Sequence, residues 1–358
     1  MRWRGSTLAD ALARPANGFT PVRLLLALAV VVSHGFSITT GRIEDEPLFR
    51  LTGFTLGEHA VNGFFAVSGL LVTMSFWRRS LRDYLLARLL RILPALAVAA
   101  LAVAILLGPA LTTRSLAIYL GDPETWRFVA ETLRFKSNGR LPGVFDDNPF
   151  RTPIPTVWTL RYEVLFYAGL VVCGVLGLRR VRMAAPILAG GLFVALIAIE
   201  TAWPDASKAT RTTFRLAFLF AAGGSLYLWR DRVPLSAAGA GALALLAVAT
   251  ARLPVYPAVL FAAEAYGVIW LSLSPGLVQF GDWRNDLSYG VYLYGWPIQQ
   301  AFRQLLPGAG SVELLVPALF VTLVVAFASW RLVEKPALAL KFRSVGPIRF
   351  RTAEPGGS

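Results

Sequence analysis

The sequence predicts an all-α, polytopic membrane protein with about ten transmembrane helices and both termini in the cytoplasm. Three observations carry this prediction: an apolar composition, long apolar stretches that recur along the chain, and Lys and Arg that gather at alternate ends of those stretches. Of the 358 residues, 56% are hydrophobic and only 16% are charged, and the mean hydropathy is +0.58. Because about a quarter of the residues of a soluble domain are usually charged, a membrane protein is the first expectation.

The expected helices follow from the ~20 mostly apolar residues that a helix needs to span a bilayer. The basic, amphipathic start of the chain is interpreted as a cytoplasmic lead-in and not as a cleaved signal peptide. The short stretch ARLPVYP alone separates the seventh and eighth candidates, so these two are the hardest to count. In chain order we expect helices near residues 22–40, 60–77, 92–112, 156–178, 184–201, 212–229, 234–250, 254–274, 287–305 and 313–333.

One long connection, residues 113–155, joins the third and fourth predicted helices. It is rich in Gly, Pro, Asn and Asp, and long loops are often functional; a plain external linker is the alternative. The predicted organisation is one transmembrane domain over residues 1–340, followed by a cytoplasmic, disordered tail over 341–358.

Lys and Arg set the expected orientation. With both termini inside, about 20 basic residues lie on the cytoplasmic side and about 7 on the other, the long connection excluded. This asymmetry accounts for the net charge of +14, so nucleic-acid binding is not expected. The only cysteine, Cys173, excludes an intramolecular disulfide and a Cys-based metal site, and we expect no metal.

Several polar side chains interrupt the apolar stretches, where ionisable groups are costly and often functional. Helical rise puts His34 ~18 Å from the inner face of a ~30 Å core and Glu163 ~10 Å from the outer face. An imidazole and a carboxylate at one depth form a general-base arrangement, in which the carboxylate orients the ring. One layer in the outer half is therefore predicted to hold five polar side chains: His34, Ser68, Glu163, Gln299 and Gln300.

Each of these residues also has a structural interpretation. His34 and the two glutamines could be hydrogen-bonded packing residues, and Glu163 could pair with Arg161. Ser68 and Gly69 are a small pair of the kind that lets helices pack closely.

A second cluster is expected at the inner face. Arg88 and Arg91 are spaced i, i+3 and share a helix face, just before Pro94. Two guanidinium groups on one face suit phosphate or pyrophosphate. Anchoring of the topology is the alternative.

Six stretches, in order, resemble the acyltransferase-3 family of mostly bacterial, multi-pass membrane acyltransferases. They are FTPVRLLLALAVVVSH, with an early Arg (Arg23) and a final His; AVNGFFAVSGLLV; ARLLRILPAL; TVWTLRYEVLFY; DLSYGVYLYGWPIQQ; and LVEKPAL. Two positions depart from the common pattern: Asn62 replaces an Asp, and Gly295 replaces a His. The Gln pair after the ninth-helix Pro is typical of one branch that lacks a fused hydrolase-like domain.

The resemblance implies transfer of an acyl group, by default acetyl, from cytoplasmic acyl-CoA to a sugar hydroxyl of a surface polysaccharide, lipopolysaccharide, lipid-linked oligosaccharide or secreted glycoside. The expected location is the bacterial inner membrane. Acetyl-CoA is the expected donor, held by Arg23, Arg88 and Arg91, and membrane lipids surround the chain. His34 and Glu163 are the expected catalytic residues. The expected oxyanion or acceptor-positioning residues are Ser68, Asn62, Gln299, Gln300, Trp158 and Tyr292.

Two mechanisms remain open at this point. His34, oriented by Glu163, could remove the acceptor proton, or it could carry the acyl group itself. Two other function classes also remain: a transporter or flippase for a glycolipid or polysaccharide intermediate, which would use intramembrane His and Glu, and an inert scaffold in polysaccharide assembly.

Overall fold

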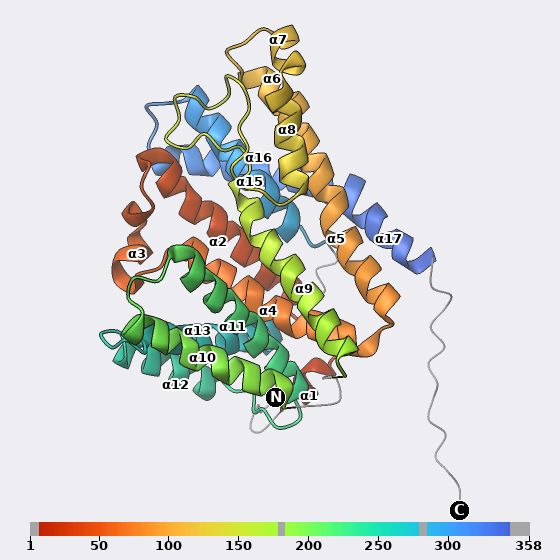
Figure 1. Ribbon diagram of the computed structural model, residues 1–358, viewed down its shortest axis with the longest axis vertical. Helices are drawn as coiled ribbons and strands as arrows, with labels where there is room; N and C mark the ends of the chain where they lie inside the picture. The colour runs from red at the N-terminus through yellow and green to blue at the C-terminus, as the bar shows by residue number, and fades with distance from the viewer. Residues whose placement is uncertain (1–6, 178–182, 279–284, 344–358) are drawn as a thin grey trace, which may run out of the picture.

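The computed structural model describes residues 7–177, 183–278 and 285–343, with side chains up to residue 340. Within these ranges the chain is helical and has no strand. Figure 1 shows the long helices gathered in one bundle, with α6, α7, α8 and the segment after them at one end. The helices are α1 (Leu8–Leu12), α2 (Phe19–Thr40), η1 (Ile43–Asp45), α3 (Pro47–Thr52), α4 (Leu56–Arg78), α5 (Leu81–Ala102), η2 (Val103–Leu107), α6 (Gly108–Leu111), α7 (Leu116–Gly121), α8 (Pro123–Leu133), η3 (Pro155–Val157), α9 (Trp158–Val175), α10 (Ala184–Ala202), α11 (Lys208–Leu228), α12 (Ala237–Ala249), α13 (Tyr256–Leu273), α14 (Pro275–Val278), α15 (Ser288–Leu305), α16 (Ser311–Ser329), η5 (Trp330–Glu334) and α17 (Lys335–Arg343).

A multi-pass membrane architecture is confirmed, and each of the ten predicted ranges coincides with a helix. Seven helical stretches of the described residues are long and apolar enough to cross a membrane: Phe19–Thr40, Leu56–Arg78, Leu81–Leu111, Pro155–Val175, Ala184–Ala202, Tyr256–Leu273 and Ser311–Leu340. The other three helices fall short, since α12 has only 13 residues, while α11 and α15 are long but more polar. The count of ten spans and the cytoplasmic termini stay predictions.

Several helices begin earlier than expected, and in α4 and α5 polar residues inside the helices conceal the true starts. Thr55 caps α4 in a reciprocal capping box with Glu58, so the helix begins at Leu56. Ser80 caps α5, which begins at Leu81, about eleven residues before the predicted start. Arg88 and Arg91 therefore lie within the helix, in its second and third turns.

Helices α4 and α11 pack very closely, and small residues make this possible. A Cβ atom on Gly69 would collide with the backbone carbonyl of Phe220, and one on Gly223 would collide with that of Ala66. Backbone approach of this kind is how small residues hold membrane helices together. The packing role considered for the Ser68–Gly69 pair is thus present at Gly69.

The long connection contains α7 and α8 and is fastened to the second half of α15 by three side chains. Gln304 Oε1 accepts from the Phe145 amide at 3.0 Å. Gln300 Oε1 accepts from Asn148 at 2.9 Å, and Trp296 donates to the Thr152 carbonyl at 2.9 Å. The segment after α8 is therefore held over this end of the bundle.

Near its end, the last long helix contains a π-helical stretch, η5, that carries Glu334. Such π-turns are frequent at functional sites, and Glu334 is only 2% exposed. The predicted tail lies outside the described residues from 344 onward, and α17 runs to Arg343.

Candidate active site

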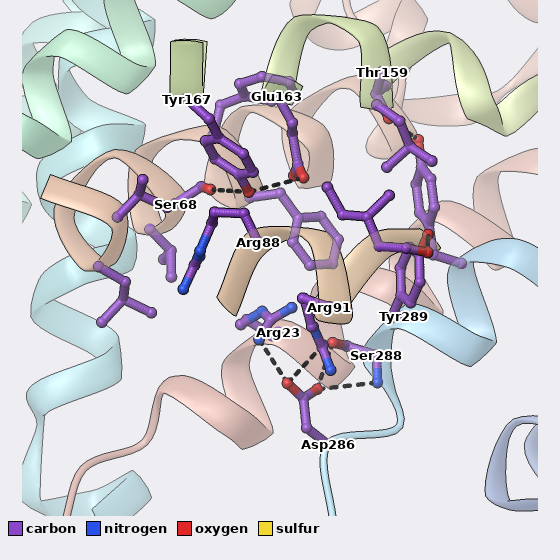
Figure 2. A pocket seen from close by; sticks show the side chains of 18 of the residues that line it. Arg23, Ser68, Arg88, Arg91, Thr159, Glu163, Tyr167, Asp286, Ser288 and Tyr289 are labelled. Atoms are coloured by element: carbon purple, nitrogen blue, oxygen red, sulfur yellow. Dashed lines mark hydrogen bonds and ion pairs between the residues drawn. The ribbon is translucent and has the colours of Figure 1, made fainter. Parts of the chain in front are cut away.

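Two of the cavities that the described residues form adjoin each other inside the bundle. The arginine cavity, about 310 Å³, lies between the start of α2 and α5, the middle of α4 and α9, and the start of α15. The histidine cavity, about 430 Å³, is lined by the later part of α2, the first turns of α4, α9 and α11, and the segment before α9. Figure 2 shows the polar side chains of the arginine cavity.

Three arginines line the arginine cavity, and two of them share a carboxylate. Asp286 accepts from Arg23 at 2.6 Å and from Arg91 at 2.8 Å. Arg91 also reaches Glu334 at 3.3 Å. Figure 2 shows both guanidinium groups turned toward Asp286.

Asp286 is ionised in this environment. Burial alone would raise its pKa, but Arg23, Arg91 and the hydroxyl and amide of Ser288 lower that pKa to about 2. The carboxylate therefore offsets part of the charge of Arg23 and Arg91, which are both partly buried.

Arg88 differs from its neighbours because it has no ion pair within the described residues. Its guanidinium lies 5.6 Å from the centre of the Tyr167 ring, and its Nε is buried without a hydrogen-bond partner. Figure 2 places Arg88 between the Asp286 cluster and the opposite wall. Of the three arginines, it is the one left to bind an anionic ligand.

The opposite wall is formed by a short hydrogen-bonded chain. Tyr167 donates to Glu163 at 3.1 Å, and the Ser68 and Tyr167 hydroxyls lie 3.5 Å apart. Glu163 and Tyr167 are spaced i, i+4 on α9 and so share one helix face. Thr159, one turn before Glu163 on the same helix, lines the cavity beside them.

His34 lines the other cavity, among aromatic side chains. Its ring meets Trp296 edge-on with centroids 4.8 Å apart, and Trp296 meets Phe150 in the same way at 5.5 Å. Trp158 lines this cavity too, beside Arg161. The His34 Nδ1 is buried and has no hydrogen-bond partner in the part of the chain that the structure describes.

The structure separates the residues predicted to form one layer. His34 and Glu163 line different cavities and share no hydrogen bond among the described residues, so the expected orientation of the imidazole by this carboxylate is not observed. Ser68 lies with Glu163 and not with His34. The early start of α4 explains this, because Ser68 is twelve residues into the helix and so ~18 Å along it.

Three other predicted residues line neither cavity. Asn62 donates to Glu264 at 2.7 Å, Gln299 donates to the Val31 carbonyl at 2.8 Å, and Gln300 donates to the Phe150 carbonyl at 2.5 Å. These are the packing interactions considered as the alternative for the two glutamines. As oxyanion donors they would have to leave these partners. The members of the predicted set that line a cavity are Ser68, Trp158 and Tyr292.

Comparison with known proteins agrees with this architecture. A family model described as an acyltransferase domain matches residues 18–331. The chain belongs to this acyltransferase family. It is also similar to an O-acetyl transferase of Shigella phage Sf6, with 28% identity over 336 residues that cover 89% of this chain and 95% of the relative. No solved structure matches the chain.

In this acyltransferase, packing explains the absent second histidine. A Cβ atom on Gly295 would collide with Cγ2 of Val31. Because Val is β-branched and stiff at χ1, the position has no space for an imidazole without a shift of α2. The His34 ring therefore has no second histidine beside it from α15.

The sequence analysis missed three residues of the arginine cavity or its rim. Tyr167 was signalled by the Glu-x-x-x-Tyr spacing, and Glu334 by its place in LVEKP, although neither was given a role. Asp286 carried no spacing signal, because its partners Arg23 and Arg91 are 263 and 195 residues away.

Proposed function

We propose that the protein is a membrane O-acetyltransferase that moves an acetyl group from acetyl-CoA to a sugar hydroxyl. The observation that carries this proposal is the pair of adjoining cavities. One contains an arginine without an ion pair among the described residues, and the other contains a histidine among aromatic rings. The family supplies acyl transfer, and the phage relative is named for acetyl transfer to oxygen. We further propose that the protein resides in the bacterial inner membrane.

The donor is assigned to the arginine cavity. Coenzyme A carries phosphates, and a guanidinium binds phosphate through paired, charge-assisted hydrogen bonds. Arg88 is available for this contact, while Asp286 holds Arg23 and Arg91 in place beside it. With the positive-inside orientation, this cavity lies toward the cytoplasm, where acyl-CoA is found.

The acceptor is assigned to the histidine cavity. Trp158 and Trp296 offer apolar rings, and Trp158 an indole N–H, which suit the mixed apolar and polar surface of a sugar. Phe150 and Thr152, from the segment held by α15, also line this cavity. The segment before α9 thus helps to shape the acceptor site.

His34 acts as the general base in this scheme. Its ring takes the proton of the acceptor hydroxyl while the oxygen attacks the thioester carbon. The C–S bond then breaks, and the imidazolium returns the proton to the departing thiolate. Ser68 is the hydroxyl donor proposed to stabilise the oxyanion, since the Tyr292 hydroxyl already donates to the Thr156 carbonyl. Glu163 positions Tyr167 and Ser68 without contacting the imidazole.

The test is acetyl transfer by purified protein supplied with labelled acetyl-CoA and extracted envelope glycans. His34→Ala should lower the transfer rate by about 10²–10⁴-fold, the usual contribution of a general base. His59→Gln is the matched control, since His59 contacts Glu264 and Thr52 and lines neither cavity, and it should retain activity.

Two results would contradict the proposal. One is full acetylation by His34→Ala at matched protein level. The other is loss of the entire surface glycan, and not only of its acetyl groups, in cells that lack the protein, because that result indicates export. Labelled acetyl bound covalently to His34 would indicate an acyl-histidine intermediate in place of direct attack by the acceptor.

A further inference from the structure

Only two of the described residues line both cavities: Val61 of α4 and Tyr292 of α15. Val61 is 7% exposed and Tyr292 is 8% exposed. We call this pair the neck. A group that moves directly from one cavity to the other passes beside these two side chains.

The neck is held rigidly. The Tyr292 hydroxyl lies 2.7 Å from the Thr159 hydroxyl and donates to the Thr156 carbonyl at 3.1 Å. The Tyr292 ring also meets Phe64 edge-on, with centroids 6.1 Å apart. Val61 is β-branched and has one strongly preferred rotamer in a helix. Neither side chain can swing aside without the loss of packing or hydrogen bonds.

The chemistry of transfer puts the reacting carbon at this point. Arg88 and the donor arm lie on one side of the neck, whereas His34 and the acceptor hydroxyl lie on the other. The thioester carbon therefore has to stand at the neck when the acceptor oxygen attacks it. The alkyl part of the acyl group then packs against the Val61 isopropyl group and the Tyr292 ring.

We propose that the neck, Val61 with Tyr292, selects the acyl group and limits it to acetyl. This inference rests on the proposed function, because it assumes transfer between the two cavities. In this proposal the acetyl methyl group packs against two stiff side chains, and the added methylene of a propionyl group displaces Val61 or Tyr292.

The test is a competition between acetyl-CoA and propionyl-CoA for one acceptor preparation, with the two products measured by mass spectrometry. Val61→Ala removes two methyl groups from the neck. We expect the ratio of propionyl to acetyl product to rise about tenfold or more, because one methylene in an apolar pocket is worth 10–200-fold in discrimination. Val61→Ile should lower the same ratio below that of the unsubstituted enzyme.

Val259→Ala is the matched control. Val259 lies in α13, lines neither cavity and is also 7% exposed. It loses the same two methyl groups at equal burial, so a general loosening of the protein would raise its ratio as well. We expect its product ratio to equal that of the unsubstituted enzyme.

The outcomes separate the neck from the proposed function. If the ratio of propionyl to acetyl product is unchanged in both Val61→Ala and Val61→Ile while acetyl transfer is intact, only the selection by the neck is overturned. The same holds if Val259→Ala raises this ratio as much as Val61→Ala does. If Val61→Ala does not fold, the product ratio of Val61→Ile still tests the role of the neck. No acetyl transfer by the unsubstituted enzyme overturns the proposed function and the neck with it.

Discussion

At the scale of single residues, charge compensation divides the three arginines of the arginine cavity into two kinds. Arg23 and Arg91 share Asp286, and Arg91 also contacts Glu334, which is buried. A buried ion needs such a partner, because removal from water costs several kcal/mol. Arg88 has no such partner within the described ranges, so a ligand phosphate can supply its counter-charge.

This division predicts a donor-binding defect at Arg88. Arg88→Ala should raise the KM for acetyl-CoA about tenfold or more, the value of a charge-assisted hydrogen bond, with a smaller change in kcat. The KM of Arg88→Lys should lie between that of Arg88→Ala and that of the unsubstituted enzyme, because an ammonium cannot bind phosphate bidentately. The measurement is steady-state kinetics with varied acetyl-CoA.

Arg82→Ala provides the control for Arg88. Arg82 lies on the same helix, α5, but is exposed and lines neither cavity. Its KM should match that of the unsubstituted enzyme. An unchanged KM in Arg88→Ala would remove Arg88 from the donor site.

At the scale of helices, the crossing of α4 and α11 fixes the position of Ser68 and Val61. Gly69 and Gly223 let the two backbones touch. Because Ser68 precedes Gly69 and Val61 lies two turns earlier on α4, any separation of this crossing moves both cavity walls.

Gly69→Ala is therefore expected to lower the free energy of unfolding by about 1–3 kcal/mol, the usual cost of an overpacked contact. Gly190→Ala in α10 is the matched control, since a Cβ atom there has no neighbour within 4 Å. Its unfolding temperature should stay the same or rise slightly, since Ala favours helix over Gly. Thermal unfolding of purified protein measures both, and equal unfolding temperatures would contradict the close contact.

At the scale of the whole molecule, the positions of the two cavities distinguish the two ends of the bundle. The arginine cavity is lined by the first turns of α2 and α15, and the histidine cavity by the first turns of α4 and α9 and the later part of α2. The distribution of Lys and Arg then predicts that the arginine cavity faces the cytoplasm.

Cysteine labelling tests this orientation. In a Cys173→Ser background, Leu51→Cys in α3, where Leu51 is 81% exposed, should react with a membrane-impermeant maleimide in intact cells. Arg82→Cys should react only after permeabilisation. The reverse pattern would invert the topology and would exclude a cytoplasmic donor at Arg88.

The sequence by itself determined the class of the protein, the approximate positions of the helices and several of the polar residues that line the cavities. Apolar length, Lys and Arg asymmetry and six ordered motifs are local properties, so they can be recognised without a fold. His34, Glu163, Ser68, Tyr292, Trp158 and the arginines were all found in this way.

Only the tertiary structure decided which of these residues meet. Depth counting cannot separate Ser68 and Glu163 from His34, because helix starts hidden among polar residues shift depth by several ångströms and helix rotation is unknown. The role of Asp286 depends on contacts across about 200 residues of chain. The neck at Val61 and Tyr292 exists only where α4 and α15 meet, since neither side chain forms a boundary without the other.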